Sequence, residues 1–93
     1  MNNFNFLLSP ADINLDIARR VKARRKEQKI TQQRLSELSD VSLGSVKRFE
    51  RTGEISLSSL IKIGFALNCE DDFAALFAKK KYSSIQEVIN DQT

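Results

Sequence analysis

The stretch TQQRLSELSDVSLGSVKRFE, residues 31–50, decides how this 93-residue chain folds. Thr31 has a side-chain oxygen that can accept a hydrogen bond from the free N–H groups at the start of a helix. It therefore predicts a helix from Gln32 to Ser39. Leu35 and Leu38 lie three residues apart on this helix, and we expect both side chains to face inward.

A second helix follows a three-residue turn centred on Asp40. Aspartate tolerates the left-handed backbone conformation that a tight connection between helices needs. Ser42 then caps a helix that runs to about Arg51, with Val46 and Phe49 on its inner face. Two short helices joined in this way form a helix-turn-helix, a motif whose second helix enters the major groove of DNA.

Three further helices are predicted around this pair. Ser9 and Pro10 begin a helix that extends to about Gln28. Ser56 caps a fourth helix to about Leu67, and a fifth should run from about Glu70 to Ala78. The apolar faces expected on these three helices are Ile13, Ile17 and Val21 in the first, Leu57, Leu60, Ile61, Ile63, Gly64 and Leu67 in the second, and Phe73, Leu76 and Phe77 in the third.

The fold class that follows is all-α, with a single five-helix domain. We place the domain at residues 10–78, after a short N-terminal arm at residues 1–9. Residues 79–93 form a C-terminal extension, where SIQE, residues 84–87, fits a capping box and predicts a short last helix. A domain of this size has only marginal stability, which oligomerisation would increase.

The composition argues against an enzyme, a metal site and a cofactor site. The chain has no histidine, and its only cysteine, Cys69, excludes an internal disulfide. The sequence contains no CxxC pair, no glycine-rich phosphate loop and no G-x-S-x-G element. The N-terminus has no basic segment followed by a long apolar run, so we expect a cytoplasmic protein without a membrane segment.

Positive charge is concentrated in one third of the chain. Residues 19–51 hold eleven Lys and Arg against four acids, a local charge of +7 in a chain whose net charge is +3. A cluster of this kind favours binding to a polyanion, although charge alone fits a solvated helix surface equally well.

The segment from Ala18 to about Phe77 resembles the Xre-family helix-turn-helix domain of the Cro and phage-repressor type. The residues that carry the resemblance are Arg20, Val21, Lys22 and Arg25, then Ile30, Thr31, Gln32, Leu35 and Ser36, then Val41, Ser42, Val46, Phe49 and Glu50, and finally Leu60 to Leu67. The resemblance implies a lambda-repressor-like domain that binds operator DNA as a homodimer.

The resemblance also implies roles for individual residues. The positions that match base-reading residues are Leu43, Gly44, Ser45, Lys47 and Arg48. The positions expected at DNA phosphates are Gln32, Ser42, Arg25 and Arg51. Arg25 and Glu50 match an ion pair that ties the first helix to the end of the third.

Gly44 and Leu43 have no side-chain hydrogen-bond donor. Leu43 can contact thymine methyl groups, and Gly44 lets the backbone approach the groove closely. The alternative for Gly44 is a tolerated weak position in the helix.

A narrower resemblance concerns RFERTGEISL, residues 48–57. This phrase is similar to the helix-turn-helix antitoxins that partner HipA-like kinase toxins and repress their own operon. The alternative function is therefore a protein-interaction module that neutralises such a toxin.

Overall fold

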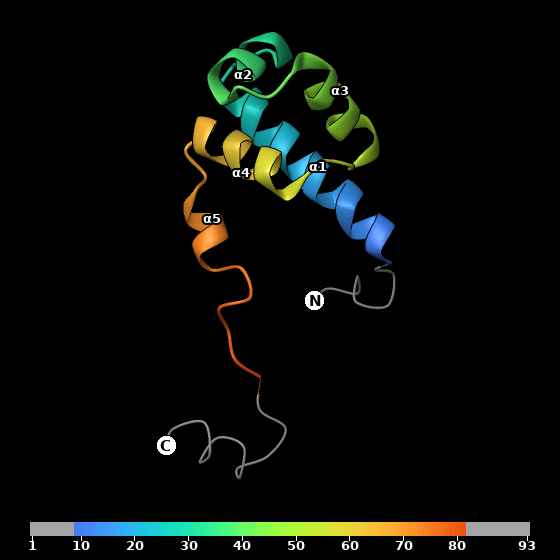
Figure 1. Cartoon of the computed structure of the whole chain (residues 1–93), viewed down its shortest axis with the longest axis vertical. Helices are drawn as coiled ribbons and strands as arrows, with labels where there is room; N and C mark the ends of the chain where they lie inside the picture. The colour runs from blue at the N-terminus through green and yellow to red at the C-terminus, as the bar shows by residue number, and fades with distance from the viewer. Residues whose placement is uncertain (1–8, 82–93) are drawn as a thin grey trace.

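The computed structural model describes residues 9–81, and within them the chain is entirely α-helical (Figure 1). The five helices are α1 (Pro10–Glu27), α2 (Gln32–Ser39), α3 (Leu43–Thr52), α4 (Leu57–Ala66) and α5 (Asp71–Ala74). The predicted all-α, five-helix class is confirmed. Most of the N-terminal arm and the last helix predicted for the C-terminal extension lie outside the described residues.

The helix boundaries follow from local hydrogen bonding. The hydroxyl groups of Ser9, Thr31, Ser42 and Ser56 each accept a hydrogen bond from the backbone N–H three residues later. These bonds satisfy donors that have no partner within the helix. All four predicted caps are therefore confirmed.

Left-handed residues end the two helices of the central pair. Asp40 follows α2 with φ of 60°, and Gly53 follows α3 with φ of 81°. A side chain on Gly53 would meet the backbone of α1, because an added Cβ would lie 2.7 Å from the carbonyl carbon of Asn14. Glycine is thus required here both for its conformation and for the close approach.

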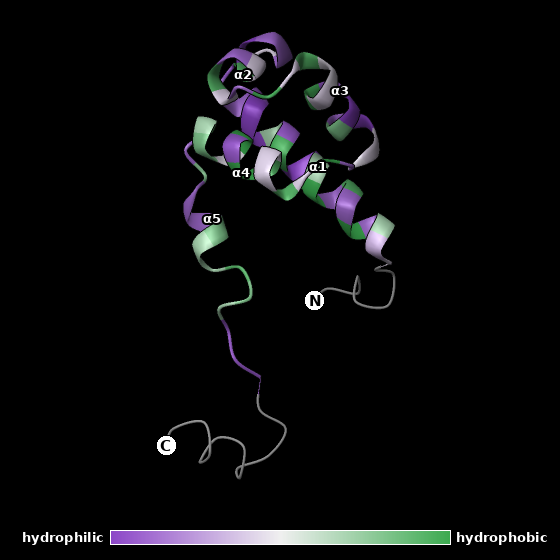
Figure 2. Ribbon diagram, viewed as in Figure 1, coloured by the Kyte–Doolittle hydropathy of each residue, from purple (hydrophilic) through white to green (hydrophobic). Residues whose placement is uncertain are grey.

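The core lies where α1, α2, α3 and α4 meet. α3 packs against α1 and α2, and α2 also packs against α4. The ribbon of α1 alternates hydrophilic and hydrophobic residues, as expected for a helix with one buried face (Figure 2). The buried hydrophobic residues are Ala18, Leu35, Val41, Val46, Phe49, Ile63 and Leu67. Among residues 9–81, no helix combines the length and the apolar character needed to cross a bilayer.

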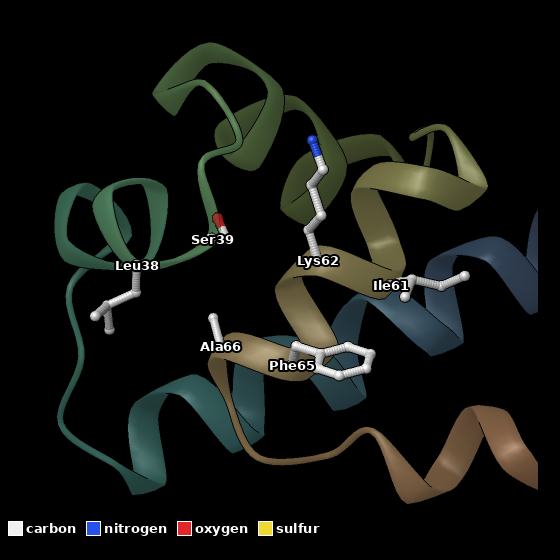
Figure 3. A pocket seen from close by; sticks show the side chains of 6 residues that line it. All are labelled: Leu38, Ser39, Ile61, Lys62, Phe65 and Ala66. Atoms are coloured by element: carbon white, nitrogen blue, oxygen red, sulfur yellow. The ribbon is translucent and has the colours of Figure 1, made fainter.

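The prediction that Leu38 faces inward is wrong. Its side chain is 45% exposed, whereas Leu35 and Ser39, four residues apart, form the buried face of α2. Ser39 is accommodated because its hydroxyl donates to the Leu35 carbonyl at 2.6 Å. Leu38 instead lines an open hollow between α2 and α4, together with Ile61 and Phe65 (Figure 3).

The first and fourth helices bury less than predicted at their N-terminal ends. Ile13 is 40% exposed and Leu57 is 61% exposed. Both residues lie in the first turns of their helices, and the core is built from residues farther along.

The fifth helix is shorter than predicted. α5 ends at Ala74 instead of Ala78, and Phe77 has a left-handed backbone with φ of 58°. Leu76 and Phe77, expected on its buried face, are 54% and 96% exposed. Of the three predicted apolar residues, Phe73 packs against α4. Its ring lies so close to Gly64 that a Cβ added to Gly64 would come within 2.3 Å of the ring. The prediction that Gly64 allows a close helix approach is therefore confirmed.

Candidate nucleic-acid interface

The outward face of α3 is polar and cationic. Successive residues of an α-helix are separated by about 100°, so residues three, four and seven positions apart share a face. Val46 and Phe49 occupy the buried side of α3. The side turned to solvent carries Gly44, Lys47, Arg48 and Arg51, with Ser45 beside it. These are the residue types that contact base edges and phosphates.

The start of α3 is held by a small hydroxyl cluster. The Ser42 hydroxyl accepts the N–H of Ser45 at 3.1 Å and donates to the Ser45 hydroxyl at 2.9 Å. Both hydroxyl groups therefore help to form the cap. A DNA contact by either would have to compete with these bonds. Leu43, the first residue of the helix, is half-buried and presents only part of its side chain to a ligand.

Gly44 occupies open space. A Cβ added to its backbone would have no neighbouring atom within 4 Å, in contrast to Gly53 and Gly64. The packing of residues 9–81 therefore gives no reason for a glycine at this position. The absence of a side chain leaves the backbone of α3 uncovered at the centre of its exposed face.

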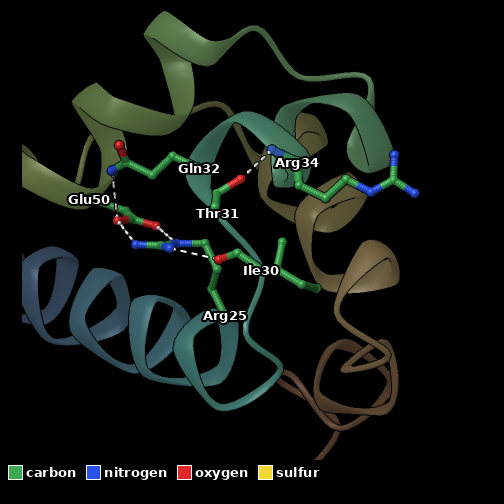
Figure 4. A network of polar contacts seen from close by, with 6 residues as sticks. All are labelled: Arg25, Ile30, Thr31, Gln32, Arg34 and Glu50. Carbon is green, nitrogen blue, oxygen red and sulfur yellow. Dashed lines mark hydrogen bonds and ion pairs between the residues drawn. The ribbon is translucent and has the colours of Figure 1, made fainter.

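A buried network fixes α3 relative to α1. The Arg25 guanidinium donates from Nε to Glu50 Oε2 at 2.7 Å and from Nη2 to Glu50 Oε1 at 2.9 Å (Figure 4). Its Nη1 donates to the carbonyl oxygen of Ile30 at 2.8 Å, and Gln32 Nε2 donates to Glu50 Oε1 at 2.9 Å. The predicted ion pair between Arg25 and Glu50 is confirmed, with a bidentate geometry that favours a single orientation.

The network also controls the ionisation of Glu50. Burial alone would raise the pKa of this carboxyl group, but hydrogen bonds from Arg25 and Gln32 outweigh it and hold the pKa below its ordinary value. Glu50 is thus a carboxylate at neutral pH. Its charge is needed to balance a guanidinium whose side chain is only 9% exposed.

Two of the expected phosphate contacts change in light of this geometry. Arg25 is buried and each of its three nitrogens donates one hydrogen within the protein, which favours the ion-pair role; the direct phosphate contact expected for this residue stays a prediction. Gln32 gives one amide hydrogen to Glu50, which leaves the second for an external acceptor. Arg34, in the first turn of α2, points to solvent (Figure 4), and its guanidinium pairs with Glu37 at 3.1 Å.

The sequence reasoning missed the partner of Arg48. In the structure Arg48 Nη2 forms an ion pair with Glu54 Oε1, and this acid lies just beyond the end of α3. The signal was present in the sequence, because the left-handed Gly53 turns the chain so that the next residue lies beside the last turn of the helix. Within residues 9–81, neither Lys47 nor Arg51 forms an ion pair.

Comparison with known proteins agrees with this arrangement. Residues 21–73 match the family model HTH_3, described as Helix-turn-helix. The chain belongs to this helix-turn-helix family. The match extends over more than half of the chain, and the Xre-type resemblance is confirmed. No curated protein and no solved structure matched the chain.

The HTH_3 segment includes both the buried network and the exposed face of α3. Members of this family are DNA-binding regulators, and the chain is a DNA-binding regulator of this kind. The two helices of the helix-turn-helix motif are α2 and α3, and they are joined through Asp40, Val41 and Ser42. α3 is therefore the helix in the position that enters the groove.

Proposed function

We propose that this protein is a cytoplasmic repressor that binds a specific double-stranded operator, with α3 in the major groove. The observation that carries the proposal is the exposed face of α3. It holds Lys47, Arg48 and Arg51 on one side of a helix whose other side is buried against α1 and α2. Cations in this position supply affinity for phosphates and donors for guanine.

The residues divide into two groups by their expected contacts. The base-reading group is Leu43, Gly44, Ser45, Lys47 and Arg48. The phosphate-binding group is Gln32, Ser42 and Arg51. Arg25 and Glu50 serve both groups indirectly, since they fix the angle between α1 and α3.

Selection of bound sequences from a pool of random duplexes tests the proposal and supplies the operator. Arg48→Ala should then weaken binding to the selected operator by about 1–3 kcal/mol more than binding to a random duplex. Arg34→Ala is the matched control, because Arg34 is also an exposed, ion-paired arginine but lies on α2. Equal losses on both duplexes for Arg48→Ala would show that this residue reads no base.

We infer further that the repressor is a homodimer that uses the segment after α5. Leu76 and Phe77 are apolar and exposed, and a side chain such as Phe77 gains free energy when a second subunit covers it. The Phe77→Ser variant should shift the dimer towards monomer in analytical ultracentrifugation and leave the helical circular-dichroism spectrum of the folded domain unchanged. A dimer of undiminished affinity would place the interface elsewhere.

A second role, that of an antitoxin, is favoured by two features. The sequence RFERTGEISL, residues 48–57, is similar to antitoxins, and apolar side chains on α2 and α4 are exposed. Leu38 and Phe65 expose 45% and 60% of their surface around the hollow between α2 and α4. A HipA-like kinase encoded by the adjacent gene, and a stable complex between the two purified proteins, would support this role. The two functions are compatible, because such antitoxins repress their own operon.

A further inference from the structure

The contact between Arg48 and Glu54 sets Arg48 apart from the other cations of α3. Arg48 Nη2 meets Glu54 Oε1, and the two side chains are 62% and 60% exposed. The hydrogen bond from Arg48 lowers the pKa of Glu54, so the acid is ionised at neutral pH. Lys47 and Arg51 lie on the same face without an ion-pair partner among the described residues. Of the three cations, only Arg48 is thus oriented by an ion pair among residues 9–81.

The backbone around Glu54 is itself held in place. The Thr52 hydroxyl donates to the carbonyl oxygen of Arg48 at 2.8 Å and accepts the N–H of Glu54 at 3.1 Å. Gly53, between them, is buried against Asn14 of α1. The backbone of Glu54 is therefore held beside the last turn of α3 by hydrogen bonds and packing.

The geometry of an arginine leaves room for a ligand while this pair is intact. A guanidinium has five N–H donors, and the contact with Glu54 occupies a hydrogen of Nη2. The two hydrogens of Nη1 remain available, as does the second hydrogen of Nη2. Adjacent N–H groups of this kind are the ones that bind guanine O6 and N7 together.

We propose that Glu54 is a positioning residue that holds Arg48 in the orientation for reading a guanine and keeps it from random phosphates. A phosphate contact outside this orientation requires Arg48 to leave the carboxylate, whereas a guanine contact does not. Glu54 therefore improves discrimination and lowers affinity for random DNA. This inference rests on the proposed function, in which Arg48 reads a base.

The test uses the full chain, the selected operator and a scrambled duplex of the same composition. Glu54→Ala should lower the operator-to-scrambled affinity ratio about threefold to tenfold. Without Glu54, Arg48 can add a phosphate contact on scrambled DNA. The slope of log binding constant against log salt concentration on that duplex should therefore become steeper by about 0.9. Between roughly 50 and 200 mM salt, this change corresponds to an additional factor of about 3.5.

Two comparisons separate this role from a general effect of charge. Glu37→Ala removes an acid from a similar exposed pair with Arg34 on α2, and should leave the affinity ratio unchanged. In an Arg48→Ala background, Glu54→Ala should also leave the ratio unchanged. Thermal unfolding of each variant checks that the fold is retained.

Each failure has its own meaning. If Arg48→Ala lowers the ratio but Glu54→Ala does not, the role of Glu54 is refuted and the proposed function stands. The role of Glu54 is also refuted if Glu54→Ala still lowers the affinity ratio in the Arg48→Ala background. The same conclusion follows if Glu37→Ala lowers the ratio equally. If Arg48→Ala leaves the ratio intact, base reading by Arg48 fails, and the inference about Glu54 fails with it.

Discussion

Replacement of Gly44 by alanine should make the protein more stable and a weaker operator binder. In the structure the new methyl group meets no atom within 4 Å, so it causes no clash in the free protein. Alanine also loses less backbone entropy than glycine when a helix forms. The two effects on folding and binding therefore have opposite signs.

The size of each effect follows from the position of the residue. Gly44 is the second residue of α3, where the gain in stability should fall at the lower end of the range for a helix, about 0.5 kcal/mol. That gain corresponds to a rise in melting temperature of roughly 2–4 °C. If α3 approaches the groove through this uncovered backbone, the methyl group is overpacked there and operator binding falls by about 1–3 kcal/mol. This loss is roughly 5- to 150-fold in affinity.

Gly53→Ala is the matched control, because the same chemical change meets a different environment. The φ of 81° disfavours alanine, and the new Cβ would lie 2.7 Å from the backbone of Asn14. We expect a loss of about 2 kcal/mol and a melting temperature lower by roughly 8–16 °C.

Thermal unfolding by circular dichroism and operator titration by fluorescence anisotropy measure the two effects separately. An unchanged or higher operator affinity for Gly44→Ala would refute the close approach of the backbone and leave Gly44 as a tolerated weak position. A fall in melting temperature would refute the assignment of Gly44 to open space.

Three further predictions concern the network and the remaining face of α3. Glu50→Gln should cost about 3 kcal/mol at pH 7, because it leaves the buried Arg25 without a counter-charge. Because the pKa of Glu50 is lowered in the folded protein, its contribution to stability is complete above the ordinary pKa of 4.5 and is lost as the pH falls through the folded-state pKa. The free energy of unfolding, measured in urea, should therefore fall more steeply at acid pH for the wild type than for Glu50→Gln. Arg51→Ala should reduce the salt slope by about 0.9 on operator and scrambled DNA alike, and a change confined to the operator would instead indicate base reading. Leu43→Ala should weaken thymine-containing operators more than variants that lack thymine at the contacted step; an equal loss on both would contradict a methyl contact.

The candidate site was predictable where it depended on recurring patterns. The spacing of residues 31–50 led to the correct pair of helices, and the family resemblance led to the pair of Arg25 and Glu50. The resemblance also suggested a phosphate contact for Arg25, whose side chain is buried and already donates to Glu50 and Ile30. A pattern specifies which residue types occur together, but it does not report how many of their donors remain free.

The sequence by itself determined where the helices of the motif begin and end. Capping by Thr31 and Ser42 and the left-handed turns at Asp40 and Gly53 involve atoms within about four residues, so the residue types suffice to predict them. The same locality explains why the five-helix class was correct.

Only the tertiary structure decided which faces are covered and which charges are free. Leu38 and Phe77 belong to amphipathic patterns, yet each needs a neighbouring element to bury it, and the described elements leave them 45% and 96% exposed. Whether the donors of Arg25 are free likewise depends on the packing of α3 against α1, which brings Glu50 beside it. Burial and ion pairing depend on the relative positions of whole elements, and for that reason the periodicity of one helix cannot specify them.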